Sequence, residues 1–487
     1  MLKKENKMLG SQSKTRPKGD ARASKMQTAG TEKRKARYFL VWRWHFYAGL
    51  FVIPFMLMLS ITGIVMLFDD EIEALKYQDI LYVEPQAEKL PLSTQLSAVS
   101  IAYPDSAVTQ VIVAQDESSV SRFNVIGPDG NSQFVTVNPY TADVLGTIDR
   151  SESWYQLAND IHGTLLVGKW GDYLIEMSAS LSILLLVTGV YLWLPRDNAS
   201  RAGFFKIRFH STRVLMRDLH ANLGGGLSIV LLLFLLSGLA WAGIWGGKMV
   251  QGWNTFPTYY TWGEKPQSLH KDLNHSSEEE LPWNLELAPV PESSHHGHEI
   301  SHQSEYSASE QGVGLDKIAE YANSLNLPQY RIFLPRSDTG VYTIAANSMA
   351  GDVTDPRQDR TVHIDQYSGD TLMEVTWSDY SLIAKAMAAG VSLHQGDLSA
   401  LNKWLNVLFC LTFIAISLTG FWMWWVRRPN NLGVPPRFEQ DGIWRVGLAT
   451  VVMLCLLFPL AGVAVIACML VDLLIVKRSP KLKEYLS

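Results

Sequence analysis

Only three cysteines occur among the 487 residues, and Cys410, Cys455 and Cys468 all lie in apolar runs. They imply neither a disulfide framework nor a thiolate metal site. The sequence also lacks a glycine-rich dinucleotide motif, which argues against a flavin or nicotinamide domain. The long segments between the apolar runs contain no nucleophile–base or phosphate-loop arrangement. The chemistry of the chain must therefore come from other side chains.

Charged residues are missing from four long stretches, at about residues 46–68, 177–194, 221–247 and 404–426. Each stretch is long enough, or nearly so, for the roughly 20 residues of a membrane-spanning helix. The total hydrophobic content of 47% is ordinary for a soluble protein, but the apolar residues are pooled in these runs. The chain is therefore predicted to be a polytopic α-helical membrane protein.

Lys and Arg gather before the first apolar run, in a segment that ends TEKRKAR, and again in the connector before the third run. Such residues concentrate in loops that stay in the cytoplasm. The segment after the first run begins instead with Asp69 and Asp70. We therefore expect a cytoplasmic N-terminus and two long outer segments. The first run begins about forty residues in and lacks a cleavage pattern, so it is predicted to be a retained anchor.

The apolar runs carry an internal repeat. The first and third begin with a histidine that is followed by a glycine four residues on and by a Thr-Gly or Ser-Gly pair seventeen and eighteen residues on. These residues are His45, Gly49, Thr62 and Gly63, and His220, Gly224, Ser237 and Gly238. The second and fourth runs are preceded by a histidine and contain Thr-Gly and a tryptophan: His162, Thr188, Gly189 and Trp193, and His394, Thr419, Gly420 and Trp424. The repeat predicts two tandem copies of span, outer segment, histidine and span.

Each outer segment has the pattern of a small α+β module, with one helix-forming stretch followed by short strand-forming runs and turn residues. The two segments match best at VNPYTADVL, residues 137–145, and IDQYSGDTL, residues 364–372. We expect two modules, each with one helix on a short antiparallel sheet. The insertion before the second module is rich in Ser, Glu, Pro and His and is predicted to be mostly irregular.

The C-terminal apolar stretch from Trp444 to Val476 is broken at Pro459. A single crossing would place the basic end KRSPKLK outside, so a hairpin of two short helices is predicted. The complete predicted order is a disordered basic cytoplasmic tail (1–36), span 1 (37–68), outer module 1 (69–160), histidine segment and span 2 (161–195), basic cytoplasmic connector (196–219), span 3 (220–247), insertion (248–310), outer module 2 (311–378), histidine segment and span 4 (379–427), and cytoplasmic loop with apolar hairpin (428–487).

Histidine beside an apolar span costs free energy unless it is paired or liganded. By the expected orientation, His45 and His220 lie at the cytoplasmic face and His162 and His394 at the outer face. The outer two precede the inner ends of their spans by some thirty residues, so they are placed on short amphipathic segments folded back onto the bundle. Facing imidazoles without nearby Cys, Asp or Glu suit a bis-histidine haem better than zinc. The alternative is a half-buried imidazole whose tip points to water.

Six glycines support two haem sites. They are Gly49, Gly63, Gly224, Gly238, Gly189 and Gly420. Eighteen residues of helix rise about 27 Å, so Gly63 and Gly238 are expected at the outer face, where they would make room for a porphyrin. Gly189 and Gly420 would serve the inner one. The alternative is that small residues merely allow close packing of membrane helices.

The insertion carries a further histidine cluster, with His270 and His275 upstream. Its members are His295, His296, His298 and His302. Such a tract binds metal ions, although in an exposed segment this binding is more often weak and adventitious. His210 and His363 have no counterpart in the repeat and are interpreted as incidental.

From about Trp42 onward the chain resembles the PepSY-associated transmembrane family, which includes PiuB-type iron-regulated inner-membrane proteins and ferric-siderophore reductases of Gram-negative bacteria. The resemblance rests on Trp44-His45, on the module ends NPYTADVL and DQYSGDTL, on Asp218-Leu219-His220 and on the two Thr-Gly-x-x-x-Trp span ends. It implies two b-type haems in the bacterial inner membrane, held by His45, His220, His162 and His394, that pass electrons to a periplasmic ferric chelate such as a ferric siderophore.

The electron donor implied by this reading is a quinol or a separate reductase. Two other classes remain open: a non-enzymatic protein whose PepSY modules restrain a periplasmic peptidase, and a metal permease. The basic N-terminal run is expected to meet anionic membrane lipid rather than nucleic acid.

Overall fold

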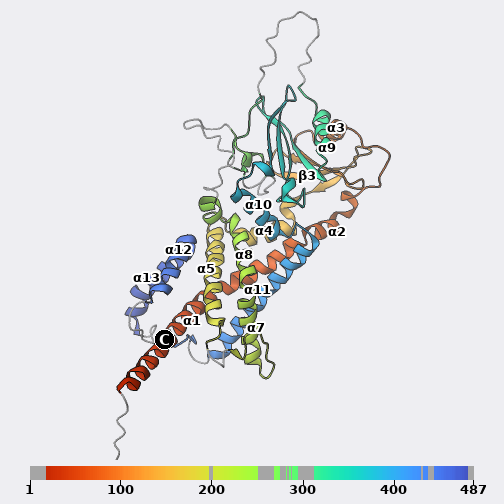
Figure 1. The fold of residues 1–487 in the computed structure, drawn as a ribbon. Helices are drawn as coiled ribbons and strands as arrows, with labels where there is room; N and C mark the ends of the chain where they lie inside the picture. The colour runs from red at the N-terminus through yellow and green to blue at the C-terminus, as the bar shows by residue number, and fades with distance from the viewer. Residues whose placement is uncertain are drawn as a thin grey trace, which may run out of the picture.

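The computed structural model describes residues 18–196, 201–250, 268–274, 281, 285–286, 288–293, 312–428, 432–436 and 444–480. The chain forms a helical bundle with a β-sheet domain, here called the head, at one end (Figure 1). Within the described residues, four helices are long and apolar enough to cross a membrane. They are Glu32–Leu67 of α1 (Lys18–Leu67), α5 (Lys169–Trp193), α11 (Ala400–Arg427), and α13 (Pro459–Leu474) with its following turn. The protein is a multi-pass membrane protein.

The start of α1 corrects the prediction of a disordered tail over residues 1–36, because the helix begins at Lys18. The residues from 18 to 36 are rich in Ala, Lys and Arg, which are good helix formers even where no apolar face is present. Residues 1–17 lie outside the described part of the chain.

The predicted single span over residues 220–247 is also corrected. It is divided into α7 (Thr212–Gly226) and α8 (Ser228–Gly238), which bend by 65° at Leu227. The run Gly224–Gly226 precedes the bend, and glycine weakens a helix interior. A Cβ atom on Gly225 would lie only 2.3 Å from the Trp193 ring. The close approach of this ring, together with three glycines, explains why the helix breaks here.

Two short helices join the head to the bundle. They are α4 (Trp154–Thr164) and α10 (Leu382–Gln395), and each begins with a serine whose hydroxyl accepts a main-chain N–H of the first turn. Helix α4 packs against α1 and α5, and α10 against α8 and α11. Helices α12 (Arg445–Leu457) and α13 pack on each other after a break at Phe458, beside the predicted break at Pro459.

The head contains eight antiparallel strands in the order β4-β3-β2-β1-β5-β6-β7-β8. Their bounds are β1 (Ala107–Ala114), β2 (Ser121–Ile126), β3 (Ser132–Val137), β4 (Val144–Ile148), β5 (Gln329–Phe333), β6 (Val341–Ala346), β7 (Arg360–Asp365) and β8 (Thr371–Thr376). The expected two separate sheets therefore form one sheet, joined where β1 pairs with β5. This pairing satisfies main-chain groups that two separate four-stranded sheets would leave exposed at an edge.

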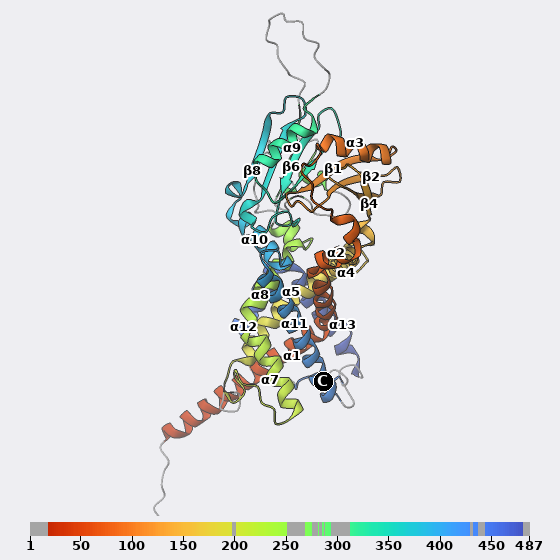
Figure 2. The same ribbon diagram turned by 90° about the vertical axis from the view of Figure 1, so that its right-hand side faces the viewer.

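One face of the sheet is covered by α3 (Leu92–Ala102) and α9 (Leu315–Ser324), which lie next to each other on the head (Figure 2). A single apolar core joins both halves, with Val99 and Ile318 from the helices packed on strand residues such as Phe123 and Ile344. Because this core crosses the β1–β5 junction, the two halves form one unit.

The opposite face has a different cover on each half. The end of α2 (Asp69–Leu81) places Ile80 and Leu81 against the first half. Described residues of the insertion, between 268 and 293, cover the second half, and we call them the strap. Within it, Leu281 contacts Phe333 and Ala345. The strap contains no α-helix or strand in its described residues, as predicted for the insertion, but it is packed onto the sheet.

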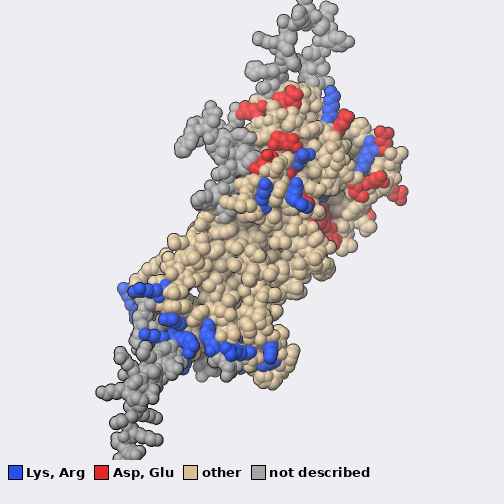
Figure 3. Space-filling model, viewed as in Figure 1, with Lys and Arg blue, Asp and Glu red and all other residues tan. Residues whose placement is uncertain are grey.

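Charged side chains are distributed unevenly along the molecule (Figure 3). Lys and Arg gather at the end of the bundle far from the head, called here the basic end, and the head carries both signs. The visible face between them shows a broad band without charged side chains. This distribution is the one expected for a protein that crosses a membrane.

Candidate functional site

The four histidines at repeated positions form two pairs in the structure. His45 of α1 and His220 of α7 lie toward the basic end, with ring centroids 6.2 Å apart and ring planes at 88°. His162 of α4 and His394 of α10 lie at the head end, close enough to interact electrostatically. None of the four is fully buried, so the helices leave space beside each ring.

Each histidine directs Nδ1 at a hydroxyl oxygen on a neighbouring helix. The pairs are His45 and Thr188 at 3.0 Å, His162 and Thr62 at 2.9 Å, His220 and Thr419 at 3.4 Å, and His394 and Ser237 at 3.1 Å. These hydroxyls belong to the four Thr-Gly and Ser-Gly pairs of the sequence repeat. The repeat therefore contains each imidazole together with its hydrogen-bond partner.

The direction of these hydrogen bonds follows from their surroundings. Thr62 and Thr188 donate their own hydroxyl protons to main-chain carbonyls one turn back, at 2.9 and 2.8 Å. Their oxygens are then free to accept from Nδ1–H. A main-chain carbonyl, which can only accept, also faces each ring: Ile416 at 2.9 Å from Nδ1 of His220, Phe234 at 3.2 Å from Nδ1 of His394, Leu185 at His45 and Leu59 at His162.

A histidine that donates from Nδ1 keeps the lone pair on Nε2, which is the arrangement of a metal-bound imidazole. The hydroxyls and carbonyls thus select one tautomer at all four positions. His394 is further held by Phe234, whose ring stacks on it with centroids 4.4 Å apart. The bundle fixes both the tautomer and the orientation of the candidate ligands.

The glycine after each hydroxyl makes room for the imidazole ring. An added Cβ would lie 3.3 Å from Cε1 of His45 at Gly189, 3.1 Å from that of His220 at Gly420, 3.6 Å from that of His162 at Gly63 and 2.9 Å from that of His394 at Gly238. The nearest neighbour of each of these four glycines is thus a histidine ring. Gly63 and Gly238 lie beside the head-end pair, and Gly189 and Gly420 beside the pair toward the basic end.

Gly49 and Gly224 have a different environment. Added Cβ atoms would meet only Leu185 and Ile416, at 3.8 and 3.9 Å, which are ordinary van der Waals distances. These two glycines do not crowd any histidine. Neither is required for the hydrogen bonds of the four rings.

The His45–His220 pair has the dimensions of a bis-histidine site. Two metal–nitrogen bonds of about 2 Å, with about 1 Å from each nitrogen to its ring centre, separate two ring centroids by about 6 Å, and the observed separation is 6.2 Å. Among the described residues, no three His, Cys, Asp or Glu side chains converge as a metal site. Two imidazoles suffice for haem, because the porphyrin supplies the other ligands.

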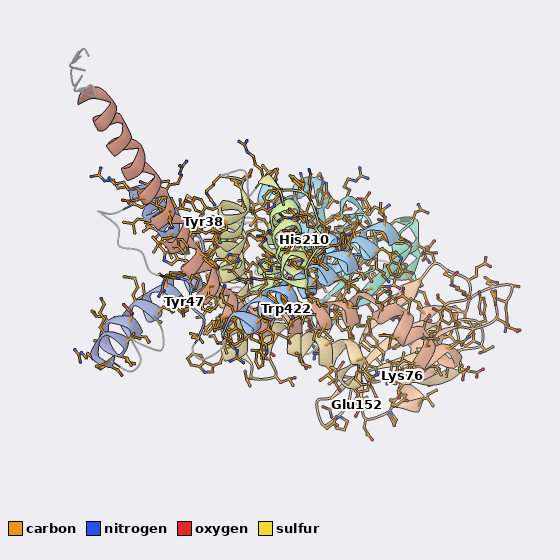
Figure 4. The ribbon with its side chains drawn as sticks, turned by 90° about the horizontal axis from the view of Figure 1, so that it is seen from below. Tyr38, Tyr47, Lys76, Glu152, His210 and Trp422 are labelled. Atoms are coloured by element: carbon orange, nitrogen blue, oxygen red, sulfur yellow. The ribbon has the colours of Figure 1, made fainter. Side chains whose placement is uncertain are left out.

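The remaining histidines occupy three environments. His210 is exposed in the connector before α7, where Figure 4 shows it from below. His295, His296, His298 and His302 of the predicted metal tract lie outside the described residues, as does His275. His270 and His363 are brought together in the head, 2.9 Å apart, so the interpretation of His363 as incidental is wrong.

Sequence reasoning missed the hydroxyls as partners of the histidines. The sequence pattern identifies Thr62, Thr188, Thr419 and Ser237 only as members of the repeat. The signal was present, because a hydroxyl residue stands before the glycine in all four copies. A buried imidazole needs a partner for its second nitrogen, and this constant neighbour was the available one.

A comparison with known protein families points to the region of the chain that carries the four histidines. A family model described as the PepSY-associated TM region matches residues 42–427, which include all four histidines and both halves of the head. No curated protein matches the chain by sequence. The extent of the family match shows that the chain belongs to the PepSY-associated transmembrane family.

Proposed function

We propose that this protein is a haem-containing reductase of the bacterial inner membrane that moves electrons across the membrane to a ferric chelate, such as a ferric siderophore, in support of iron uptake. The observation that carries this proposal is the set of four histidines held by Nδ1 in two pairs, at opposite ends of the bundle. We further propose that two tandem copies of span, module and span underlie this arrangement.

The proposed inner site consists of His45 and His220, and the outer site of His162 and His394. Haem b, when bound at each pair, supplies a one-electron couple. The four histidines would hold the group, each in a single tautomer, and the helices around them would provide an apolar surrounding. Thr188 and Thr62 hold His45 and His162 in place, while the Ile416 and Phe234 carbonyls hold His220 and His394.

The proposed direction of electron transfer follows from the charge distribution. The basic end is assigned to the cytoplasm, because Lys and Arg concentrate in cytoplasmic loops, and the head is assigned to the periplasm. Electrons from a quinol or a separate reductase would enter at the inner pair. At the outer pair, one electron reduces Fe³⁺ of the chelate to Fe²⁺, which is held less strongly by hard oxygen ligands.

The purified protein from haem-replete cells is expected to show the absorption bands of low-spin b-type haem. His45→Ala and His220→Ala should each remove only the inner haem, and His162→Ala and His394→Ala only the outer one, because each pair binds separately. Haem-to-protein ratios and reduced-minus-oxidised spectra measure this. A colourless wild-type protein would instead favour the peptidase-restraint class, and two haems retained in all four variants would reject the ligand assignment.

Gly238→Ala is expected to reduce outer haem content, because its Cβ would lie 2.9 Å from Cε1 of His394. Overpacking of this kind costs about 1–3 kcal/mol. Gly63→Ala is the matched control at the same site, since its Cβ would lie at the ordinary distance of 3.6 Å from His162. Haem content measured under equal haem supply should fall in the first variant alone. Equal losses in the two variants would contradict the geometry.

Thr188→Val removes the hydroxyl that accepts from His45 while nearly conserving side-chain volume. Loss of such a partner typically costs about 10- to 100-fold in metal affinity. Thr419→Val is the matched control, because the Thr419 hydroxyl lies 3.4 Å from Nδ1 of His220, farther than the 2.9 Å of the Ile416 carbonyl that remains. Inner haem affinity, measured by transfer to apomyoglobin, should weaken more in the first variant. The opposite order would show that the hydroxyls do not hold the rings.

Ferric siderophore added to the head side of reduced protein in proteoliposomes is expected to reoxidise both haems and produce Fe²⁺ in equal number to the electrons lost. Stopped-flow absorption and a ferrous chelator measure the two quantities. In His394→Ala, the inner haem should still be reduced from the other side but should reoxidise much more slowly. Failure of wild-type protein to reoxidise would place the acceptor in another chemical class.

A further inference from the structure

A buried histidine pair outside the haem sites joins the strap to the sheet. His270 opens the turn His270–Leu273 of the strap, and His363 lies within β7. Both side chains are 0% exposed. Their Nε2 atoms are 2.9 Å apart, with ring centroids at 4.8 Å and ring planes at 74°. The contact is thus a direct N–H···N hydrogen bond between two imidazoles.

The protons of this pair can be placed without ambiguity. The Ala288 carbonyl, 2.7 Å from Nδ1 of His270, can only accept, so His270 carries its proton on Nδ1. In neutral His270 the Nε2 atom must then accept, and Nε2–H of His363 donates to it. Nδ1 of His363 is left to accept from the Thr343 hydroxyl at 2.8 Å. One chain of donors runs from β6 through both rings into the strap.

An additional proton on the pair would bury a positive charge for which the described part of the head offers no carboxylate partner. On the sheet, the neighbours of His363 across β6 and β8 are Thr343 and Met373, which do not ionise near neutral pH. Asp365, two positions along β7, accepts from the N–H groups of Tyr367 and Ser368. Burial lowers the pKa of His270, and burial together with His270 lowers the pKa of His363 well below its usual range.

The other charged groups described near this face are either paired or exposed to solvent. On β5, Arg331 pairs with buried Asp352 at 3.0 Å. On the strap, Asp272 accepts from the Leu269 main-chain N–H at 2.8 Å, and Lys271 is exposed. The docked strap therefore favours the neutral form of both imidazoles.

Detachment of the strap would expose both rings to water, where a histidine has a pKa near 6.5. The docked state has the lower pKa values, so the detached state takes up protons first as pH falls. Docking is therefore fully favoured above about pH 6.5 and weakens below it, by up to tenfold per pH unit for each histidine. For the two histidines together, docking of the strap weakens by up to about a hundredfold per pH unit.

The strap also contacts the helix that carries one candidate ligand. Leu285 is 0% exposed and packs with Val375, Tyr380 and Ala384. Ala384 lies in the first turn of α10, whose other end carries His394. Loss of the strap would remove this cover from α10.

We propose that the His270–His363 pair is an acid-sensitive latch, which holds the strap on the head at neutral pH and releases it on acidification, so that the start of α10 loses its cover. The effect on the outer site rests on the proposed function, whereas the release of the strap does not. A periplasmic compartment shares the pH of the surroundings, so such a latch would respond to external acid.

Hydrogen exchange of the full-length protein in nanodiscs tests the latch. The reporting amides are two that are bonded between the strap and the rest of the head: the Ser293 N–H donates to the Thr339 carbonyl, and the Gln366 N–H donates to the Ser293 hydroxyl. After division by intrinsic exchange rates, we expect their exchange at pH 5.5 to exceed that at pH 7.5 by at least tenfold. His210→Gln, at an exposed histidine far from the strap, should behave as wild type. Equal corrected rates at the two pH values would overturn the proposal.

Replacing both histidines with glutamine (H270Q/H363Q) keeps a hydrogen-bonding pair that does not titrate, and the corrected rates should then be equal at both pH values. Should this variant fail to protect the strap at pH 7.5, His363→Gln alone leaves one titrating ring and should reduce the pH effect to roughly its square root. An undiminished pH effect in either variant would overturn the latch. A change in the outer haem spectrum at pH 5.5, in wild type but not in the double variant, separately tests the link to His394.

Discussion

The hydrogen bond from Nδ1 of each span-end histidine is the interaction on which the bundle depends. Each bond joins a different pair of helices: His45 and Thr188 join α1 to α5, His162 and Thr62 join α4 to α1, His220 and Thr419 join α7 to α11, and His394 and Ser237 join α10 to α8. In an apolar surrounding an unpartnered imidazole nitrogen is costly. The same bonds that satisfy the rings therefore also hold the helices at close range.

A second constraint governs the irregular end of the third span. Beyond Gly238 the chain leaves the α-helix, and its free N–H groups need partners. Glu176 of α5, only 1% exposed, accepts from the main-chain N–H groups of Ile244 and Trp245, at 2.9 and 3.1 Å. Asp172, one turn earlier, accepts from Gly243 at 3.3 Å. Acidic side chains in a spanning helix are thus explained by the broken helix that faces them.

The head and the bundle are linked by contacts that converge on the outer pair. Lys403 of α11 forms an ion pair with Glu71 of α2 at 2.8 Å, and the Gln395 amide, beside His394, donates to the Met349 carbonyl of the head at 3.3 Å. The strap adds Leu285 against α10. Conditions that alter the head therefore act on the helices that carry His162 and His394, while the inner pair lies apart at the basic end.

Composition and spacing alone predicted the long apolar helices, because these depend on local hydrophobicity, but not the break within the run 220–247. The repeated spacing also predicted that His45 pairs with His220 and His162 with His394. Packing alone decided the rest. The hydroxyl partner of His45 is 143 residues away, and no local rule connects the two. The junction of β1 with β5, which turns two expected modules into one sheet, depends on edges that meet only after folding. His270 and His363, 93 residues apart and outside the repeat, became a pair because the strap covers the sheet face left open by α3 and α9.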